Sequence, residues 1–242
     1  MKMTNNLKYK IFIYLLLCFT SLSVDAKPKV LIFSKTAGFH HASIPVGIAA
    51  IVKLGEENNF DADTTTDATK FSFENLKQYA AVIFLSTTGN VLNDRQQGEF
   101  EKYIRNGGGF VGVHAATDTE YDWQWYGNLV GAYFKSHPAQ QIAILHVVDN
   151  KFIATKHLPA EWKRFDEWYN FKWIAKDLHI LITIDEKSYT GGTNGDMHPM
   201  SWYHTYDGGR AFYTELGHTD ESYADPLYLG HLLGGIEYAI GK

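Results

Sequence analysis

Cysteine is almost absent from this 242-residue sequence, in which Cys18 is the single example. It stands inside an apolar N-terminal run that we expect to be removed. The remaining chain would then hold no disulfide, no thiolate metal ligand and no catalytic cysteine. Its stability must therefore come from its hydrophobic core.

Long hydrophobic runs are also scarce. The extended one, residues 11–24, is about 14 residues long, short of the roughly 20 that cross a bilayer. Lysines precede it and small residues follow it up to Ala26, an order typical of a secretory signal peptide. We expect residues 1–26 to be this signal and the protein to be exported, to the periplasm or the extracellular space. A lipoprotein signal ending at Cys18 is the alternative, but Leu17 stands where a small residue is expected.

An excess of basic residues is lacking as well. The chain has 22 Lys and Arg against 27 Asp and Glu, and removal of residues 1–26 would leave 19 against 26, a formal charge of −7. A chain this acidic is not expected to bind nucleic acid. Its glycine run, residues 107–109, precedes a predicted strand instead of following one, so it is not a GxGxxG dinucleotide fingerprint, and we expect no nicotinamide cofactor. The remaining residues, 27–242, suit a single domain.

Short apolar runs alternate with amphipathic segments in the first half of the chain. Strands are predicted at residues 29–34, 60–66, 79–85 and 110–115, with helices at residues 44–58 and from Asn93 or Asp94 to about residue 105. This alternation predicts a parallel sheet with helices on both faces. The second half predicts β-strands at residues 140–149 and 179–186, a hairpin at 199–216 that turns at 206–209, and a closing helix at 226–240.

Polar residues follow three of the predicted parallel strands. His41 comes after the first strand, Thr88 after the third, and His114 and Asp118 after the fourth. Open parallel sheets bind ligands at the carboxyl ends of their strands, so these side chains are predicted to meet at one edge. Polar loops without a function are the alternative.

Histidine is abundant, with eleven residues in the chain. Four of them stand at the ends of elements beside glycine, proline or acidic residues, and they are candidate ligands of a zinc-like divalent metal: His41, His114, His198 and His218. No HxxxH or HExxH spacing supports this hypothesis. The same imidazoles could instead be general acids and bases, because their pKa lies near neutral pH.

Glu167 is the candidate carboxylate partner of His41 and His114 in a catalytic site. It stands in the segment Asp166-Glu167-Trp168-Tyr169. Adjacent acids on a helix point in different directions, so only one of the two is predicted to enter a pocket. A solvated charged face beside packed aromatic residues is the alternative interpretation.

Aromatic residues make up 15% of the chain, and in its second half they alternate with polar residues. Surfaces that bind sugars often show this pattern. The candidate substrate-binding residues are therefore Thr88, Asp118, Trp168, Tyr169 and Trp202. Core packing is the alternative for each aromatic side chain, because aromatic rings bury large areas.

Several motifs together resemble the ThuA-like (trehalose utilisation) family over nearly the whole chain after the signal. They are KVLIFSKTAGFHHASIP, GGGFVGVHAATDT, FDEWYNF, HPMSWYHTYDGGRAFYTELGHT and GHLLGGIEYAIG. Family members resemble class I glutamine amidotransferases, which implies a flavodoxin-like three-layer α/β sandwich with a parallel central sheet, here with an added β-hairpin. Those relatives carry a nucleophilic cysteine where this chain has His114, so amidotransferase chemistry is not expected.

The family resemblance implies carbohydrate utilisation, with trehalose, another disaccharide or a 3-keto sugar as the small-molecule partner. We expect lyase, hydrolase or isomerase chemistry in which His114 moves a proton, with or without a divalent metal. A non-catalytic sugar-binding module on the same fold is the alternative. Assembly into a homo-oligomer stays open, and no transmembrane anchor is expected after the signal.

Overall fold

The structure is a computed structural model that describes residues 26–242. The predicted signal peptide, residues 1–26, lies outside this range apart from Ala26. Among the helices of the described residues, none has the length and apolar character needed to span a bilayer.

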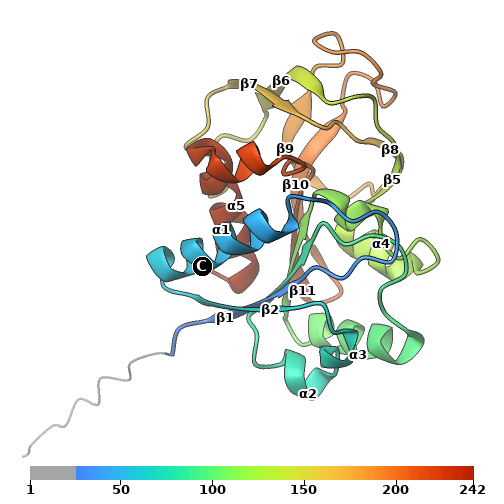
Figure 1. Ribbon diagram of the computed structural model, residues 1–242, viewed down its shortest axis with the longest axis vertical. Coiled ribbons are helices and arrows are strands. Elements are labelled where there is room, and N and C mark those ends of the chain that lie inside the picture. Colours follow the sequence, from blue (N-terminus) through green and yellow to red (C-terminus); the bar gives the residue numbers. More distant parts are fainter. Residues whose placement is uncertain (1–25) are drawn as a thin grey trace, which may run out of the picture.

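A nine-stranded mixed sheet forms the centre of the molecule (Figure 1). Its parallel half has the strand order β2-β1-β3-β4-β11 and comprises β1 (Lys29–Phe33), β2 (Asp61–Thr65), β3 (Ala81–Leu85), β4 (Gly109–Val113) and β11 (Gly209–Thr214). Strands β3 and β4 are buried along their whole length, as expected when helices cover both faces of a parallel sheet. The apolar runs of the first half therefore form the predicted parallel sheet.

The other half of the sheet is antiparallel. It continues from β11 through β10 (Pro199–Tyr206), β9 (His179–Ile184), β6 (Gln141–Val147) and β7 (Glu161–Asp166). A separate two-stranded sheet pairs β5 (Ala132–Ser136) with β8 (Asn170–Ile174).

The predicted hairpin is confirmed as β10–β11. Its turn residues Asp207 and Gly208 have φ values of 47° and 93°, the left-handed conformation that two-residue hairpin turns of type I′ require. The hairpin is more than an addition to the sheet, because β11 pairs in parallel with β4 and joins the two halves. The residues that follow β11 are thereby brought beside those that follow β4.

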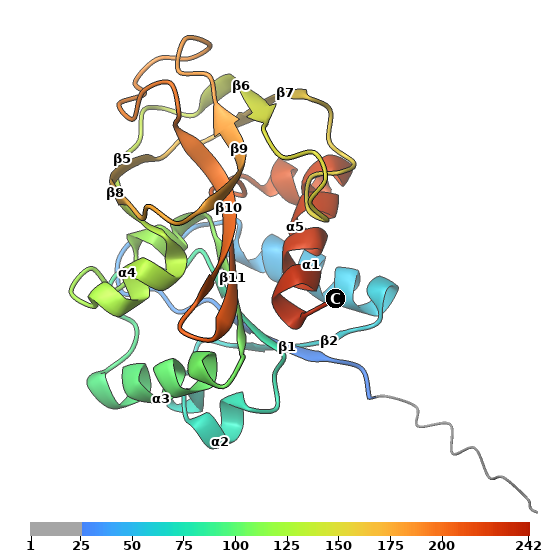
Figure 2. The ribbon, with the colours of Figure 1, turned by 180° about the vertical axis from the view of Figure 1, so that it is seen from behind.

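Helices cover both faces of the parallel half, which gives the expected flavodoxin-like sandwich (Figures 1 and 2). Helices α1 (Ile44–Asn58) and α5 (Pro226–Ile240) pack together on one face, and α3 (Asp94–Arg105) and α4 (Gln124–Val130) lie on the other, with the short α2 (Phe73–Leu76) beside α3. The predicted start of α3 is confirmed, because Asn93 and Gln96 form a reciprocal capping box. Short 3-10 helices span Ala68–Lys70, His114–Asp118 and Asp220–Ala224.

The acids of residues 166–167 do not lie on a helix, and only Glu167 lines a cavity. Strand β7 ends at Asp166, and Glu167 lies in the short segment that leads to β8. Alternation along β7 directs Arg164 and Asp166 inward and Phe165 outward. Asp166 is directed into the protein interior and Glu167 lines a cavity, and the pairing of β7 is the cause of this difference.

Candidate metal centre and active site

His114 lies at the end of β4, in the middle of the sheet. Its φ of 49° is in the left-handed region, which residues other than glycine seldom adopt, and its side chain is fully buried. Its Nδ1 lies 2.8 Å from the carbonyl oxygen of Glu215. Because a carbonyl oxygen can only accept, Nδ1 carries a proton, and the neutral form of this ring therefore has its lone pair on Nε2.

His218 and Glu167 face that lone pair. His218 Nδ1 is 3.0 Å from His114 Nε2 and 3.1 Å from Glu167 Oε2, and the third separation, from His114 Nε2 to Glu167 Oε2, is 3.5 Å. Two ligands of a tetrahedral zinc ion with bonds of about 2.1 Å are roughly 3.4 Å apart. The three atoms therefore form one face of a coordination sphere of the right size.

His41 completes the cluster from the loop after β1. Its ring is buried and meets those of His114 and His218 edge-on, at centroid distances of 4.8 and 5.2 Å. Its Nδ1 is buried and has no hydrogen-bond partner among the described residues. Burial, reinforced by His114 and His218, lowers the pKa of His41 to about 3, so the ring is neutral and free to ligate a metal.

One ligand atom from each of these four residues lies within 4.8 Å of the others. Opposite ligands of an octahedral ion lie about 4.2 Å apart, so only a small inward movement would close the set around a divalent cation. Burial raises the pKa of Glu167, but its close contacts with His114 and His218 outweigh burial and hold that pKa below its usual range. Three imidazoles and one carboxylate suit a zinc-like ion.

Asp166 holds the backbone around two of these ligands. Its Oδ1 accepts the backbone N–H groups of Glu167 and His218, at 3.1 and 3.2 Å. Its Oδ2 accepts the N–H of Gly217 at 3.1 Å, the hydroxyl of Ser222 at 3.0 Å and an N–H of Arg164 at 3.0 Å. This fully buried carboxylate thus ties the segment after β7 to the segment after β11.

Glu215 lies behind His114, away from the ligand atoms. Its Oε1 accepts the backbone N–H of Tyr169 at 2.9 Å. Burial, together with the nearby charge of Asp166, raises the pKa of Glu215 well above its ordinary value. A neutral carboxylic acid here leaves Glu167 as the negative charge that faces the three histidines.

A cavity of about 370 Å³ opens in front of the cluster. Asp118, His137 and Gln140 contribute polar groups to its wall, and Phe39, Phe134 and Tyr169 contribute aromatic rings. The Tyr169 ring packs against His114 and Phe134, at centroid distances of 4.5 and 4.3 Å. The volume and the mixture of aromatic and polar walls are typical of small-molecule sites.

The structure brings together six of the residues singled out from the sequence. His41, His114, His218 and Glu167 form the cluster, and Asp118 and Tyr169 line the cavity beside it. Thr88 is buried instead, and its hydroxyl donates to the carbonyl oxygen of Phe39 at 2.7 Å. Thr88 therefore shapes the loop that carries Phe39 and does not line the cavity.

Three other candidates lie away from the cavity. Trp168 and Trp202 are fully buried, and their indole N–H groups donate to the carbonyl oxygens of Gln141 and Val130. They belong to the core, where a large aromatic side chain with one polar group is satisfied by the backbone. His198 has Glu186 Oε1 2.8 Å from its Nδ1 and the carbonyl oxygen of Tyr169 2.8 Å from its Nε2. Both of its ring nitrogens are engaged, so it is not a candidate ligand.

Sequence analysis missed Phe39, His137 and Gln140 in the cavity wall and the anchoring role of Asp166. His137 Nδ1 lies 3.1 Å from Glu167 Oε1, and Gln140 Nε2 lies 2.7 Å from His218 Nε2. The two residues precede β6 in an exposed segment with no motif. Only the fold places them beside groups that lie far away in the sequence.

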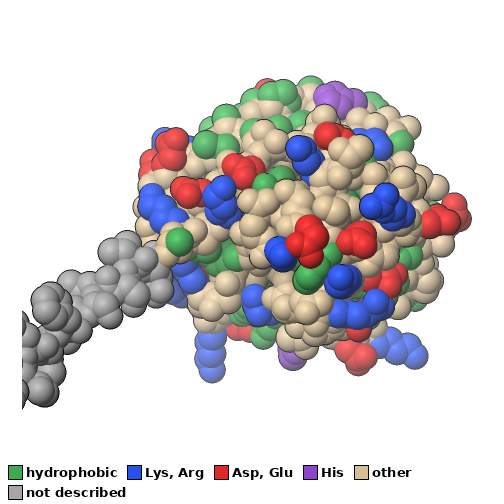
Figure 3. Space-filling view, turned by 90° about the horizontal axis from the view of Figure 1, so that it is seen from below, with side chains coloured by type: hydrophobic (Ala, Val, Ile, Leu, Met, Phe, Trp, Pro, Cys, Tyr) green, Lys and Arg blue, Asp and Glu red, His purple; other side chains and the backbone are tan. Residues whose placement is uncertain are grey.

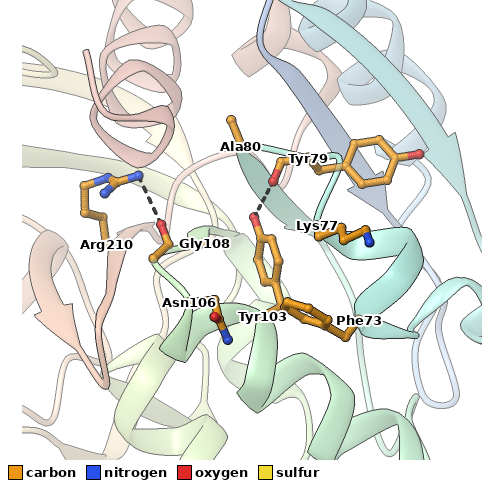
Figure 4. Close-up of a pocket in the computed structure, with 9 residues that line it drawn as sticks. Phe73, Lys77, Tyr79, Ala80, Tyr103, Asn106, Gly108 and Arg210 are labelled. Atoms are coloured by element: carbon orange, nitrogen blue, oxygen red, sulfur yellow. Dashed lines mark hydrogen bonds between the residues drawn. The ribbon is translucent and has the colours of Figure 1, made fainter.

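A second cavity, of about 320 Å³, lies at the opposite ends of the strands, before β3, β4 and β11 (Figure 4). The Tyr103 hydroxyl donates to the carbonyl oxygen of Tyr79, and the Arg210 guanidinium donates to those of Ala239 and Gly107. These polar groups already have backbone partners. On the face seen in Figure 3, positive and negative side chains are intermingled, without a broad patch of one sign. The histidine cavity is therefore the candidate functional site.

The fold and this site together define a flavodoxin-like α/β protein whose pocket is built from histidines and a carboxylate. The chain belongs to the ThuA family, described as trehalose utilisation, whose sequence model matches residues 29–239. Among curated proteins, none matches the chain significantly.

Solved structures agree with this family. A ThuA-like protein of Bacteroides uniformis is 26% identical, with a TM-score of 0.77, and the match covers 93% of this chain and 96% of that one. A ThuA-like protein of Parabacteroides merdae is 22% identical, with a TM-score of 0.73, over 89% of this chain and 91% of that one. A β-galactosidase of Bacillus circulans is 12% identical, with a TM-score of 0.57, over 90% of this chain but 31% of the enzyme. This last likeness concerns the fold alone.

Proposed function

We propose that this protein is a metal-dependent enzyme of carbohydrate utilisation, acting on a disaccharide or a keto-sugar by lyase, hydrolase or isomerase chemistry. The observation that carries the proposal is the convergence of His41, His114, His218 and Glu167, with ligand atoms within 4.8 Å of one another, at the wall of a cavity. Membership of the trehalose utilisation family supports a sugar as the substrate.

The four residues would hold the metal, and their surroundings favour ligation. The bond from His114 Nδ1 to the Glu215 carbonyl leaves His114 Nε2 unprotonated for coordination. Coordination by His218 Nδ1 would place its proton on Nε2, beside the side-chain amide of Gln140. Rotation of that amide by 180° would present its oxygen as the acceptor. A bound divalent ion would polarise a sugar oxygen and lower the pKa of a coordinated water.

The rest of the cavity would handle the sugar. With both nitrogens of His114 engaged, proton transfer would pass to Asp118 and His137, which line the same cavity. A C–H group next to a keto carbon is acidified, so a carboxylate at the position of Asp118 would suffice as its base. The Tyr121 hydroxyl donates to Asp118 Oδ1 and fixes its orientation. The rings of Phe134 and Tyr169 offer apolar faces to the C–H side of a pyranose.

The test combines metal analysis with turnover. Protein purified without chelator is expected to contain about one zinc-like ion per chain. It should convert trehalose or a 3-keto disaccharide, and chelation or His114→Ala should abolish the conversion. If turnover survives chelation but is lost in His114→Ala, the metal is not needed and His114 acts instead as a general acid or base. Sugar binding without any product would favour the non-catalytic sugar-binding module.

The proposal includes export of the protein. It rests on the basic, apolar and small-residue order of residues 1–26. Mass analysis of protein from the producing cells should find an N-terminus at Lys27. An intact N-terminus in the cytoplasmic fraction would contradict export.

A further inference from the structure

A further cavity, of about 570 Å³, adjoins the histidine cavity. The two share three wall residues, Phe39, Gln140 and His218. Each has the size of a small-molecule site, which typically measures about 300 to 1,000 Å³. The two cavities therefore form one groove, with the candidate metal ligand His218 at the junction.

Two exposed aromatic rings line the outer part of this groove. Phe39 is 66% exposed and Phe165 is 50% exposed, whereas most large aromatic side chains of this protein are buried. Phe165 is directed outward by the alternation of β7, so it contributes little to the core. Exposed apolar groups beside a cavity commonly mark a binding surface.

Acidic side chains stand on the same wall. Asp220 and Glu221 are exposed at the start of the 3-10 helix Asp220–Ala224, and both line this cavity. Carboxylates accept hydrogen bonds from hydroxyl groups but repel anions. Aromatic faces combined with carboxylate acceptors match a neutral pyranose ring, which has apolar C–H faces and a rim of hydroxyl groups.

From these contacts we infer that the outer cavity is a second sugar subsite, an inference that rests on the proposed function. One ring of a disaccharide lies in the histidine cavity, and the other lies against Phe165 with its hydroxyl groups toward Asp220 and Glu221. The bond between the rings then falls at the junction, beside His218. The protein therefore prefers a disaccharide to a monosaccharide.

The test measures binding of trehalose and of methyl α-glucoside to zinc-supplied protein by ligand-observed NMR titration. Wild-type protein should bind trehalose more tightly than the methyl glycoside. Phe165→Ala should raise the dissociation constant for trehalose about tenfold, since it removes one aromatic contact, and should leave the methyl glycoside unaffected. Phe165→Trp should restore trehalose binding.

Ile142→Ala is the matched control. Ile142 is the cross-strand neighbour of Phe165 and is 52% exposed, but it does not line the groove. The Ile142→Ala variant should therefore leave the affinities for trehalose and for methyl α-glucoside unchanged. Zinc-containing protein that binds both ligands equally, or a Phe165→Ala variant that binds trehalose normally, would overturn the second subsite and leave the metal centre standing. Protein that takes up no metal would instead contradict the proposed function.

Discussion

Two buried histidines, His114 and His198, each contact Tyr169 and each lie beside a glutamate, but their ring nitrogens have different partners. His198 has a carboxylate oxygen of Glu186 at one nitrogen and the Tyr169 carbonyl at the other. His114 has a carbonyl at Nδ1 only, and its Nε2 points at His218 and Glu167. A buried histidine becomes a candidate ligand only when one nitrogen stays available and other donors meet it there.

The largest predicted effect is on zinc affinity, and it should distinguish the histidine cluster of His114 from the group around His198. His218→Gln should weaken zinc binding by more than about 100-fold, because loss of a ligand exceeds the roughly 10- to 100-fold effect of changes around the ligands. The matched variant His198→Gln should stay within about threefold of wild type. Competition with a chromogenic chelator measures both affinities. Equal losses in the two variants would remove the distinction between the two histidines.

A smaller effect is expected from the residue that holds the ligands in place. Asp166→Asn puts an amide where Oδ2 accepts from Gly217, Ser222 and Arg164. Zinc affinity should fall roughly 10- to 100-fold, as for other positioning residues around metals.

Asp225→Asn is the control for Asp166→Asn. Asp225 also contacts Arg164, at 3.7 Å, but it caps α5 and touches none of the ligands. Thermal unfolding of the metal-free proteins separates stability from affinity. If Asp166→Asn lowers the unfolding temperature while zinc binding is unchanged, Asp166 is a structural residue only.

The smallest predicted effect is on the pH dependence of stability. It concerns His231, which has an available ring nitrogen but no group of other metal-ligating side chains beside it among the described residues. His231 donates from Nδ1 to the Ala154 carbonyl, and its Nε2 has no partner among the described residues. Burial, with smaller contributions from His157 and Arg164, lowers the pKa of His231 to about 3. The folded protein keeps this ring neutral, whereas the unfolded chain takes up a proton near pH 6.5.

Stability from His231 is therefore fully present above pH 6.5 and falls as the pH decreases toward 3. The slope is at most about 1.4 kcal/mol per pH unit for one proton. His231→Gln should remove this one-proton contribution, which urea unfolding between pH 4 and 7 would detect as a shallower dependence on pH. Parallel curves for variant and wild type would show that His231 titrates normally in the folded protein.

Sequence patterns predicted the elements whose burial depends on their own residues. The bounds expected for two helices, residues 44–58 and 226–240, agree with α1 and α5. The environments of the acids at 166–167 depend on the pairing of β7 with β6, which the local sequence does not show. Trp168 and Tyr169 are adjacent in the sequence, yet one is in the core and the other lines the cavity. Composition alone could not separate them.

The sequence by itself determined the parallel βα units, the family and the presence of histidines at strand ends, because apolar runs, turns and motifs are local properties. Only the tertiary structure decided that His218, and not His198, joins His41 and His114. The physical reason is the register of β11 beside β4, together with the buried carboxylate of Asp166. Together they bring the segment after β11, which carries His218, to the end of β4, where His114 lies.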